Sequence, residues 1–257
     1  LRIYWNLYHF MEITLTPKTI SSLSDEEIIN GVVIAINKPL EWTSFDVVNK
    51  VRWKIRKRLG VKKFKVGHAG TLDPLATGVL ILCLGKATKS IESWMTTTKS
   101  YSGEIRFGAT TPSFDLETPI DNTYSIPTFN DDVLHRLTQN FTGELMQRPP
   151  RHSAIQIQGQ RAYKQARKGT EFEIEPRPIT ITDLVLHQKA ADCLSFELTC
   201  SKGTYIRSLA RDMGRFLDNG AHLVKLTRTA VGDVELKDCF EIEDCIAMLD
   251  KHNSAVS

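Results

Sequence analysis

The chain is organised around the stretch Gly67-His68-Ala69-Gly70-Thr71-Leu72-Asp73-Pro74-Leu75-Ala76-Thr77-Gly78. Gly67 and Gly70 can adopt positive φ or let another segment approach closely, and Pro74 fixes the backbone just after Asp73. The apolar run from Val79 to Leu84 follows at once and predicts a buried strand. The sequence therefore predicts a shaped loop that presents one carboxylate at the edge of that strand. Taken alone, such a loop is more often a tight turn whose Asp caps a helix or bonds its own backbone.

Two basic stretches without any acidic residue flank this loop. One lies between Asp46 and Asp73 and the other between Glu144 and Glu171. Together they hold 15 of the 33 Lys and Arg residues, so the rest of the chain, with all 30 Asp and Glu, carries a charge of about −12. A run of charge usually marks a solvated helix face, but two such stretches beside a loop with one carboxylate favour a polyanionic partner.

Composition narrows the class of protein. The 257 residues, 41% of them hydrophobic, suffice for one large domain or two small ones, and no apolar run is long enough to span a membrane. The five cysteines lack CxxC spacing and indicate reduced core residues in a cytoplasmic protein. No HExxH motif or His/Cys cluster is present, so we expect no zinc. Residues 1–10 lack the features of a signal peptide and are either an authentic leader or sequence upstream of a start at Met11.

Strand and helix patterns mix without a regular βαβ rhythm or an internal repeat, which favours an α+β fold. Expected strands cover residues 31–37, 79–84, 101–107, 180–187, 194–200 and 225–234, and expected helices cover 44–59, 131–141, 161–168, a segment from about 205 to Gly220, and the tail from 241. The first long helix begins with Thr43 and Asp46 spaced as a capping box and ends at Gly60. Its expected apolar stripe is Phe45, Val48, Val51, Ile55 and Leu59, and most of its basic residues are expected to point elsewhere, toward an anion.

These motifs closely resemble those of the bacterial tRNA pseudouridine-55 synthases, the TruB family. Matched segments extend from about Gly31 to Gly232, and the stretch around Asp73 is similar to the family's catalytic motif throughout. Two positions depart from the family pattern: His152 stands where an aromatic residue is usual and Gln156 where lysine is usual. The other matched segments are Asn37-Lys38-Pro39, Thr43-Ser44-Phe45, Tyr101, Ser201-Lys202-Gly203-Thr204-Tyr205-Ile206-Arg207 and Gly220-Ala221-His222-Leu223.

The resemblance implies a pseudouridine-synthase fold, which is a mixed, mainly antiparallel sheet with flanking helices. Residues 1–24 would be a poorly ordered leader, and residues 25–257 one catalytic domain with a thumb-like insertion at 148–178. Many relatives continue into a small C-terminal RNA-binding domain, which we expect this chain to lack. The implied partner is the T stem-loop of tRNA. We expect a cytoplasmic monomer that needs no cofactor, metal or membrane.

The resemblance also implies roles for single residues. Asp73 would be the nucleophile, which either adds to C1′ or promotes a glycal, and Arg207 would hold its carboxylate ionised. Tyr101 would stack on the flipped uridine and help to remove the C5 proton, and His68 would fill the space that the base leaves. The thumb cations that would contact RNA phosphates are Arg161, Lys164, Arg167 and Lys168.

Tyr205 and Leu226 would line the pocket for the base, by the same resemblance. Taken one at a time, Tyr101 and Leu226 are more simply core residues, and His68 a hydrogen-bonded loop histidine. Two rival functions also stand beside the enzyme. A non-catalytic RNA-binding protein or tRNA-folding factor could use the same basic surfaces, although binding alone does not need a carboxylate among phosphates. A pseudouridine synthase that acts on another RNA site remains open.

Overall fold

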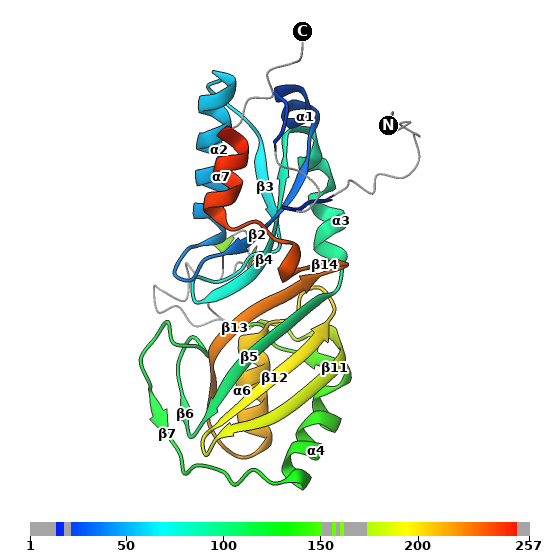
Figure 1. Cartoon of the computed structure of the whole chain (residues 1–257). Coiled ribbons are helices and arrows are strands. Elements are labelled where there is room, and N and C mark those ends of the chain that lie inside the picture. Colours follow the sequence, from blue (N-terminus) through cyan, green and yellow to red (C-terminus); the bar gives the residue numbers. More distant parts are fainter. Residues whose placement is uncertain (1–13, 18–21, 151–155, 158–159, 162–173, 251–257) are drawn as a thin grey trace. The chain divides into compact units, whose positions relative to one another are not determined.

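The computed structural model describes residues 14–17, 22–150, 156–157, 160–161 and 174–250. The chain divides into two compact units (Figure 1). Unit 1 comprises Leu1–Met95 and Asp233–Ser257, and unit 2 comprises Thr96–Gly232. Unit 1 is therefore built from two chain segments, whereas unit 2 is continuous. No helix in the described part of the chain is long and apolar enough to cross a membrane.

The sheet of unit 1 is built on β4 (Ala76–Leu84), whose residues are nearly all buried. β2 (Val33–Lys38) and β3 (Val66–Ala69) both pair with it in antiparallel register, and the short β1 (Thr14–Leu15) pairs parallel with β2. η1 (Gly85–Ser90) and α3 (Ile91–Thr96) follow β4, and β14 (Val234–Glu235) and η2 (Leu236–Asp238) precede the last helix. The strands predicted from the first two apolar runs are confirmed.

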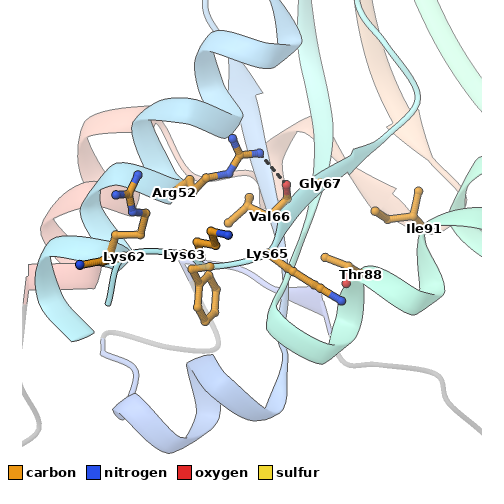
Figure 2. A pocket seen from close by; sticks show the side chains of 10 residues that line it. Arg52, Lys62, Lys63, Lys65, Val66, Gly67, Thr88 and Ile91 are labelled. Atoms are coloured by element: carbon orange, nitrogen blue, oxygen red, sulfur yellow. Dashed lines mark hydrogen bonds between the residues drawn. The ribbon is translucent and has the colours of Figure 1, made fainter. Parts of the chain in front are cut away.

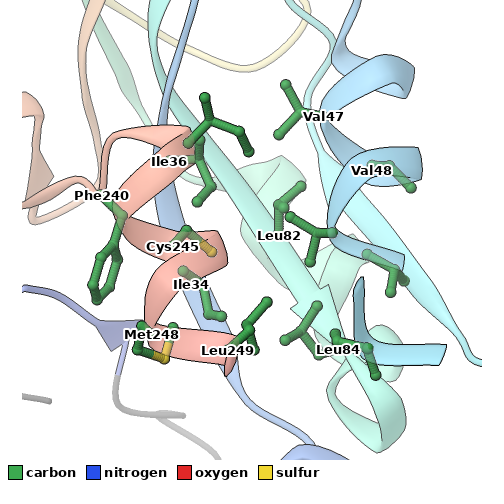
Figure 3. Packing of buried hydrophobic residues seen from close by; sticks show 14 of the residues in the cluster. Ile34, Ile36, Val47, Val48, Leu82, Leu84, Phe240, Cys245, Met248 and Leu249 are labelled. Carbon is green, nitrogen blue, oxygen red and sulfur yellow. The ribbon is translucent and has the colours of Figure 1, made fainter. Parts of the chain in front are cut away.

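Besides α3, the described helices of unit 1 are α1 (Asp25–Asn30), α2 (Ser44–Leu59) and α7 (Ile242–Asp250). α2 begins at the predicted capping box, in which the Thr43 side chain accepts from the Asp46 N–H and the Asp46 side chain accepts from the Thr43 N–H, and it ends at Gly60 with φ 64°. In Figure 1, α2 and α7 lie side by side. Figure 3 shows their apolar side chains packed with those of β2 and β4 in one core.

The predicted apolar stripe of α2 needs one correction. Val48, Val51 and Ile55 are buried as expected, but Phe45 is 58% exposed and Val47 is buried instead. Successive helical residues turn by about 100°, so Val47 lies about 40° from Val51 around the helix axis, whereas Phe45 lies about 120° from it. The five cysteines are free and buried, as predicted.

Unit 2 holds an antiparallel sheet in the order β13-β5-β12-β11-β8. Its strands are Ala221–Val231, Lys99–Phe107, Cys193–Cys200, Arg177–Ala190 and Gly143–Gln147 in that order. α4 (Asp131–Phe141) contacts β11, α6 (Ile206–Phe216) contacts β13, and the two helices contact each other, so both cover one face. The described part of unit 2 also holds two small two-stranded sheets: β6 (Ala109–Thr110) with β7 (Asn122–Thr123), and β9 (Gln156–Ile157) with β10 (Gln160–Arg161). The predicted α+β architecture is confirmed.

Several predicted boundaries in unit 2 were wrong. β13 begins at Ala221 rather than Lys225. The sequence prediction missed its first residues because a register shift between Leu223 and Lys225 interrupts the alternation that marks a strand in sequence. α6 ends at Phe216 rather than Gly220. Arg161 lies in β10 and not at the start of a helix. His152, Lys164, Arg167 and Lys168 lie outside the described residues, as does most of the predicted thumb.

Candidate active site

Asp73 lies in the loop that joins β3 to β4 in unit 1. Gly70 has φ 93°, a conformation that glycine adopts without strain. Gly67 is needed for the other predicted reason, the close approach of another segment. A Cβ at this position would lie 2.5 Å from Cδ1 of Ile91. The carbonyl oxygen of Asp73 accepts the N–H of Ala76 at 3.1 Å, which turns the chain into β4. Since a strand follows, Asp73 does not cap a helix.

Ser44, the first residue of α2, holds the backbone just before Asp73. Its Oγ accepts the N–H of Leu72 at 2.8 Å and donates to the carbonyl of the same residue at 3.0 Å. Ser44 is 2% exposed, so both bonds are made away from water. One buried hydroxyl therefore fixes both polar groups of the residue that precedes the carboxylate.

Lys38, at the end of β2, holds the backbone just after Asp73. The side chain is fully buried, and Nζ donates to the carbonyls of Pro39 at 2.7 Å, Trp42 at 2.6 Å and Pro74 at 3.4 Å. A buried ammonium is costly unless its donors are satisfied, and here its three N–H donors meet three carbonyls. Lys38 and Ser44 both fall in matched sequence motifs, but sequence reasoning gave neither residue a role at the loop.

His68 lies on β3, five residues before Asp73, and is half-buried opposite Leu82 of β4. Of the residues predicted for the site, His68 and Asp73 belong to unit 1, and the rest belong to unit 2.

In unit 2, Tyr101 and Leu226 share one face of the sheet. Tyr101 on β5 lies opposite Arg228 of β13, and Leu226 lies opposite Gly103. Opposite residues and residues two apart point to the same side of a sheet, so Lys99 and Arg228 belong to this face as well. Both cations are buried, and neither was predicted. Burial, followed by the charge of Arg228, lowers the pKa of Lys99 to about 8.

Tyr205 and Arg207 lie at the start of α6. Gln147, buried at the end of β8, accepts the N–H of Tyr205 at 2.8 Å and donates to its carbonyl at 3.1 Å. Arg207 is 5% exposed; its Nε lies 3.6 Å from Oδ2 of Asp115, and its Nη1 donates to the carbonyl of Ser113 at 3.4 Å. Sequence reasoning missed Gln147 and Asp115, because these contacts join segments far apart in the chain.

The prediction that most basic residues of α2 face an anionic partner needs correction, because half of the six pair with carboxylates of the protein itself. Three of them follow one another at helical spacing on the same side and pair with carboxylates of α7 and α1. Lys50 lies 3.9 Å from Glu243, and Lys54 pairs with Asp250. The buried Arg58 donates to Asp25 at 2.7 Å. The charge of these three cations is therefore paired within unit 1.

Within the described ranges, no group of three or more His, Cys, Asp or Glu residues could hold a metal ion. The expectation that the protein needs no metal or cofactor stays a prediction.

Comparison with known proteins gives matches over most of the chain. Residues 56–206 match the family model described as "TruB family pseudouridylate synthase (N terminal domain)". The "tRNA pseudouridine synthase B" of Phocaeicola vulgatus is 50% identical over 221 residues, which cover 86% of this chain and 94% of that protein. The protein of the same name from Chlorobium chlorochromatii is 42% identical over 226 residues, covering 88% and 87%.

Solved structures show the same fold. A chain of the "Crystal Structure of a Cbf5-Nop10-Gar1 Complex" matches with a TM-score of 0.64 and 26% identity, over 90% of this chain and 57% of that chain. A chain of the "Structure of H/ACA RNP bound to a substrate RNA containing 2'-deoxyuridine" matches with a TM-score of 0.61 and 25% identity, over 90% and 56%. This chain thus spans less than two thirds of either. These matches confirm the mixed, mainly antiparallel fold predicted from the sequence.

Proposed function

The chain belongs to the TruB family of pseudouridylate synthases, and we propose that it converts uridine to pseudouridine at position 55, in the T-loop of tRNA. The relatives named tRNA pseudouridine synthase B match over most of their length, which supports tRNA as the substrate. One observation carries the proposal. The loop that matches the catalytic motif presents a single carboxylate, and Ser44 and Lys38 hold the backbone on both sides of it.

The reaction is an isomerisation within one nucleotide. The N1–C1′ bond breaks, the uracil turns, and a C5–C1′ bond forms. C5 loses a proton and N1 ends protonated, so atoms and electrons balance without an oxidant or a transferred group. A carboxylate suits this chemistry, because it can attack or stabilise an electron-poor sugar carbon.

Asp73 is the proposed nucleophile. One route adds its carboxylate to C1′, and the other uses it to promote a glycal by loss of the C2′ proton. Deuterium at C2′ distinguishes the two routes, because only the glycal route breaks the C2′–H bond. Slower turnover of the deuterated substrate therefore indicates the glycal route.

Four residues are proposed to handle the uridine after it leaves its stack. Tyr101 stacks on the base and helps to remove the C5 proton, while Tyr205 and Leu226 line the pocket. The shared sheet face of Tyr101 and Leu226 supports a common wall. The backbone of Tyr205, held by Gln147, supports a fixed position. His68 fills the space that the base leaves.

Arg207 is proposed to keep the carboxylate of Asp73 ionised. A guanidinium has five N–H donors, so one arginine can serve Asp115 and a second carboxylate together. We further propose that residues 25–257 act as one catalytic domain, in which residues 148–178 close over the stem-loop. The working protein would be a cytoplasmic monomer without a cofactor.

The test uses the purified chain and an unmodified tRNA transcript. We expect pseudouridine in the T-loop, mapped at single-nucleotide resolution, and none when that uridine is replaced by cytidine. Modification confined to another loop would contradict the proposed position. Binding of tRNA without any product would favour the non-catalytic alternative.

A further inference from the structure

Unit 1 carries a basic pocket of about 510 Å³ that the reaction above does not use (Figure 2). It lies along the C-terminal half of α2, the segment that follows it, and the start of β3. Five of its ten lining residues are cations, and none of these ten described residues is acidic. The cations, which we call the basic pocket set, are Arg52, Arg56, Lys62, Lys63 and Lys65.

The basic pocket set differs from the other cations of α2 in its surroundings. Lys50, Lys54 and Arg58 pair with carboxylates. In the part of the chain that the structure describes, no carboxylate lies within 4.0 Å of the charged nitrogens of the pocket set. Five like charges around one cavity repel one another, and a bound anion relieves that repulsion. The distribution of charge therefore indicates an anionic ligand.

Arg52 is held in place before any ligand arrives. Its Nη1 donates to Oδ1 of Asn49 at 3.1 Å and its Nη2 to the carbonyl of Val66 at 3.0 Å. The guanidinium also lies 5.7 Å from the ring centroid of Phe45. A side chain that is already ordered loses little conformational entropy on binding. A planar guanidinium also matches the geometry of phosphate oxygens.

We propose that the basic pocket is a phosphate-binding site and that it takes neighbouring backbone phosphates of the substrate RNA. Five cations and this volume exceed what a single phosphate group needs. Gly67 lines the pocket, and the next residue along β3 is His68, so a phosphate seated there lies at the start of the segment that carries the catalytic motif. A free polyphosphate would satisfy the same cations, and this RNA assignment rests on the function proposed above.

Two pocket variants test the site. The first is Arg52→Gln with Arg56→Gln. The second is Lys62→Gln with Lys63→Gln, two exposed residues whose change does not disturb the anchored Arg52. The control is Lys50→Gln with Lys54→Gln, which removes the same charge from the opposite side of α2. The carboxylate partners of the control residues are 74% and 62% exposed, so the control is expected to fold. Thermal unfolding checks all three variants.

The first measurement is the affinity for a T-arm stem-loop RNA across a salt series. Each phosphate that the protein no longer neutralises lowers the log–log salt slope by about 0.9 on a duplex. We expect the slope to fall by about 1 to 2 in both pocket variants and by less than about 0.5 in the control. An unchanged slope in both pocket variants would overturn the assignment to RNA.

The second measurement is the binding of inorganic pyrophosphate by calorimetry. Pyrophosphate binding that both pocket variants lose, with RNA binding unchanged, would keep the phosphate site and assign it to a free polyphosphate. Loss of neither ligand would overturn the site itself. Pseudouridine formation at saturating RNA and low salt is measured separately, since its absence in the unaltered protein contradicts the proposed function and leaves the binding result intact.

Discussion

The loop that carries Asp73 and the basic pocket lie in the same unit, yet their polar groups are arranged in opposite ways. On either side of Asp73, the backbone groups of Leu72 and the carbonyl of Pro74 are satisfied inside the protein, by the hydroxyl of Ser44 and the ammonium of Lys38. In the pocket, five cations meet no carboxylate among the described residues. A reacting group must be placed before the substrate arrives, whereas a site for a polyanion gains from charge that is not already neutralised. We therefore expect the loop to govern turnover and the pocket to govern affinity.

The largest effect is expected from Asp73→Asn, which keeps the shape of the side chain and removes its charge. Turnover should fall by at least about 10⁴-fold, as for the loss of other nucleophiles, while the affinity for tRNA stays within about twofold. Single-turnover formation of pseudouridine and equilibrium binding are measured on the same preparation. A variant that keeps more than a few per cent of the turnover would assign the chemistry to another residue.

The next largest effect is expected on the affinity for tRNA, when the cations proposed to contact RNA from the thumb-like insertion are removed. Arg161, Lys164, Arg167 and Lys168 are changed together to Gln. Binding should weaken by about 100-fold, the salt slope should fall by about 0.9 for each phosphate left without its cation, and much of the turnover should remain at saturating tRNA and low salt. Measured beside the pocket variants, this variant shows how the phosphate contacts are divided. If slope and affinity do not change, these four charges only face solvent.

A smaller loss of turnover is expected from Ser44→Ala. The change removes both hydrogen bonds to Leu72, so turnover at saturating tRNA should fall by about tenfold and the free energy of unfolding by about 1 to 3 kcal/mol. Ser90→Ala is the control, since it removes a bond of Oγ to the Ala87 carbonyl, 2.8 Å long, within η1, which follows β4. Equal turnover in the two variants would show that Ser44 only stabilises the fold.

The smallest effect is expected on stability, from the cap at the start of α2. This helix carries both Ser44 and Arg52. The Thr43 hydroxyl, followed by the Thr43 backbone N–H, holds the pKa of Asp46 below its usual value. This contribution to stability is complete above the unfolded pKa of Asp46 and is lost as the pH falls through its folded pKa. Thr43→Ala should lower the free energy of unfolding by about 1 kcal/mol at pH 7.

The difference between Thr43→Ala and the unaltered protein should shrink below about pH 4, near the ordinary pKa of Asp. Urea unfolding at neutral and acid pH measures it. The same difference at both pH values would show that the Asp46 charge adds nothing to the cap.

The features that the sequence predicted well depend on residues close together in the chain. The capping box of Thr43 and Asp46, the end of α2 at Gly60, and the buried β4 all follow from patterns a few residues long. The roles of Ser44 and Gln147 could not be predicted in this way, because Ser44 contacts a residue 28 positions away and Gln147 one 58 positions away. Nothing in the local pattern marks either contact.

The run of charge along α2 shows the same limit. Sequence alone predicted a single anion-facing helix surface, because charge patterning counts cations but not their distant partners. The carboxylates that pair with Lys50 and Lys54 come from α7, near the other end of the chain. Only the tertiary structure separates these two cations from Arg52 and Arg56.

The core of unit 1 has a consequence for the order in which the protein is made. α7 supplies Cys245, Met248 and Leu249 to that core, and Phe240, two residues before α7, joins them (Figure 3). On the ribosome these residues follow Thr96–Gly232, the whole of unit 2. Synthesis at about 5 to 20 residues per second puts a delay on the order of ten seconds between the two halves of unit 1. Unit 2 can fold within that interval, whereas the segment with Asp73 waits for the last helix before its core can close.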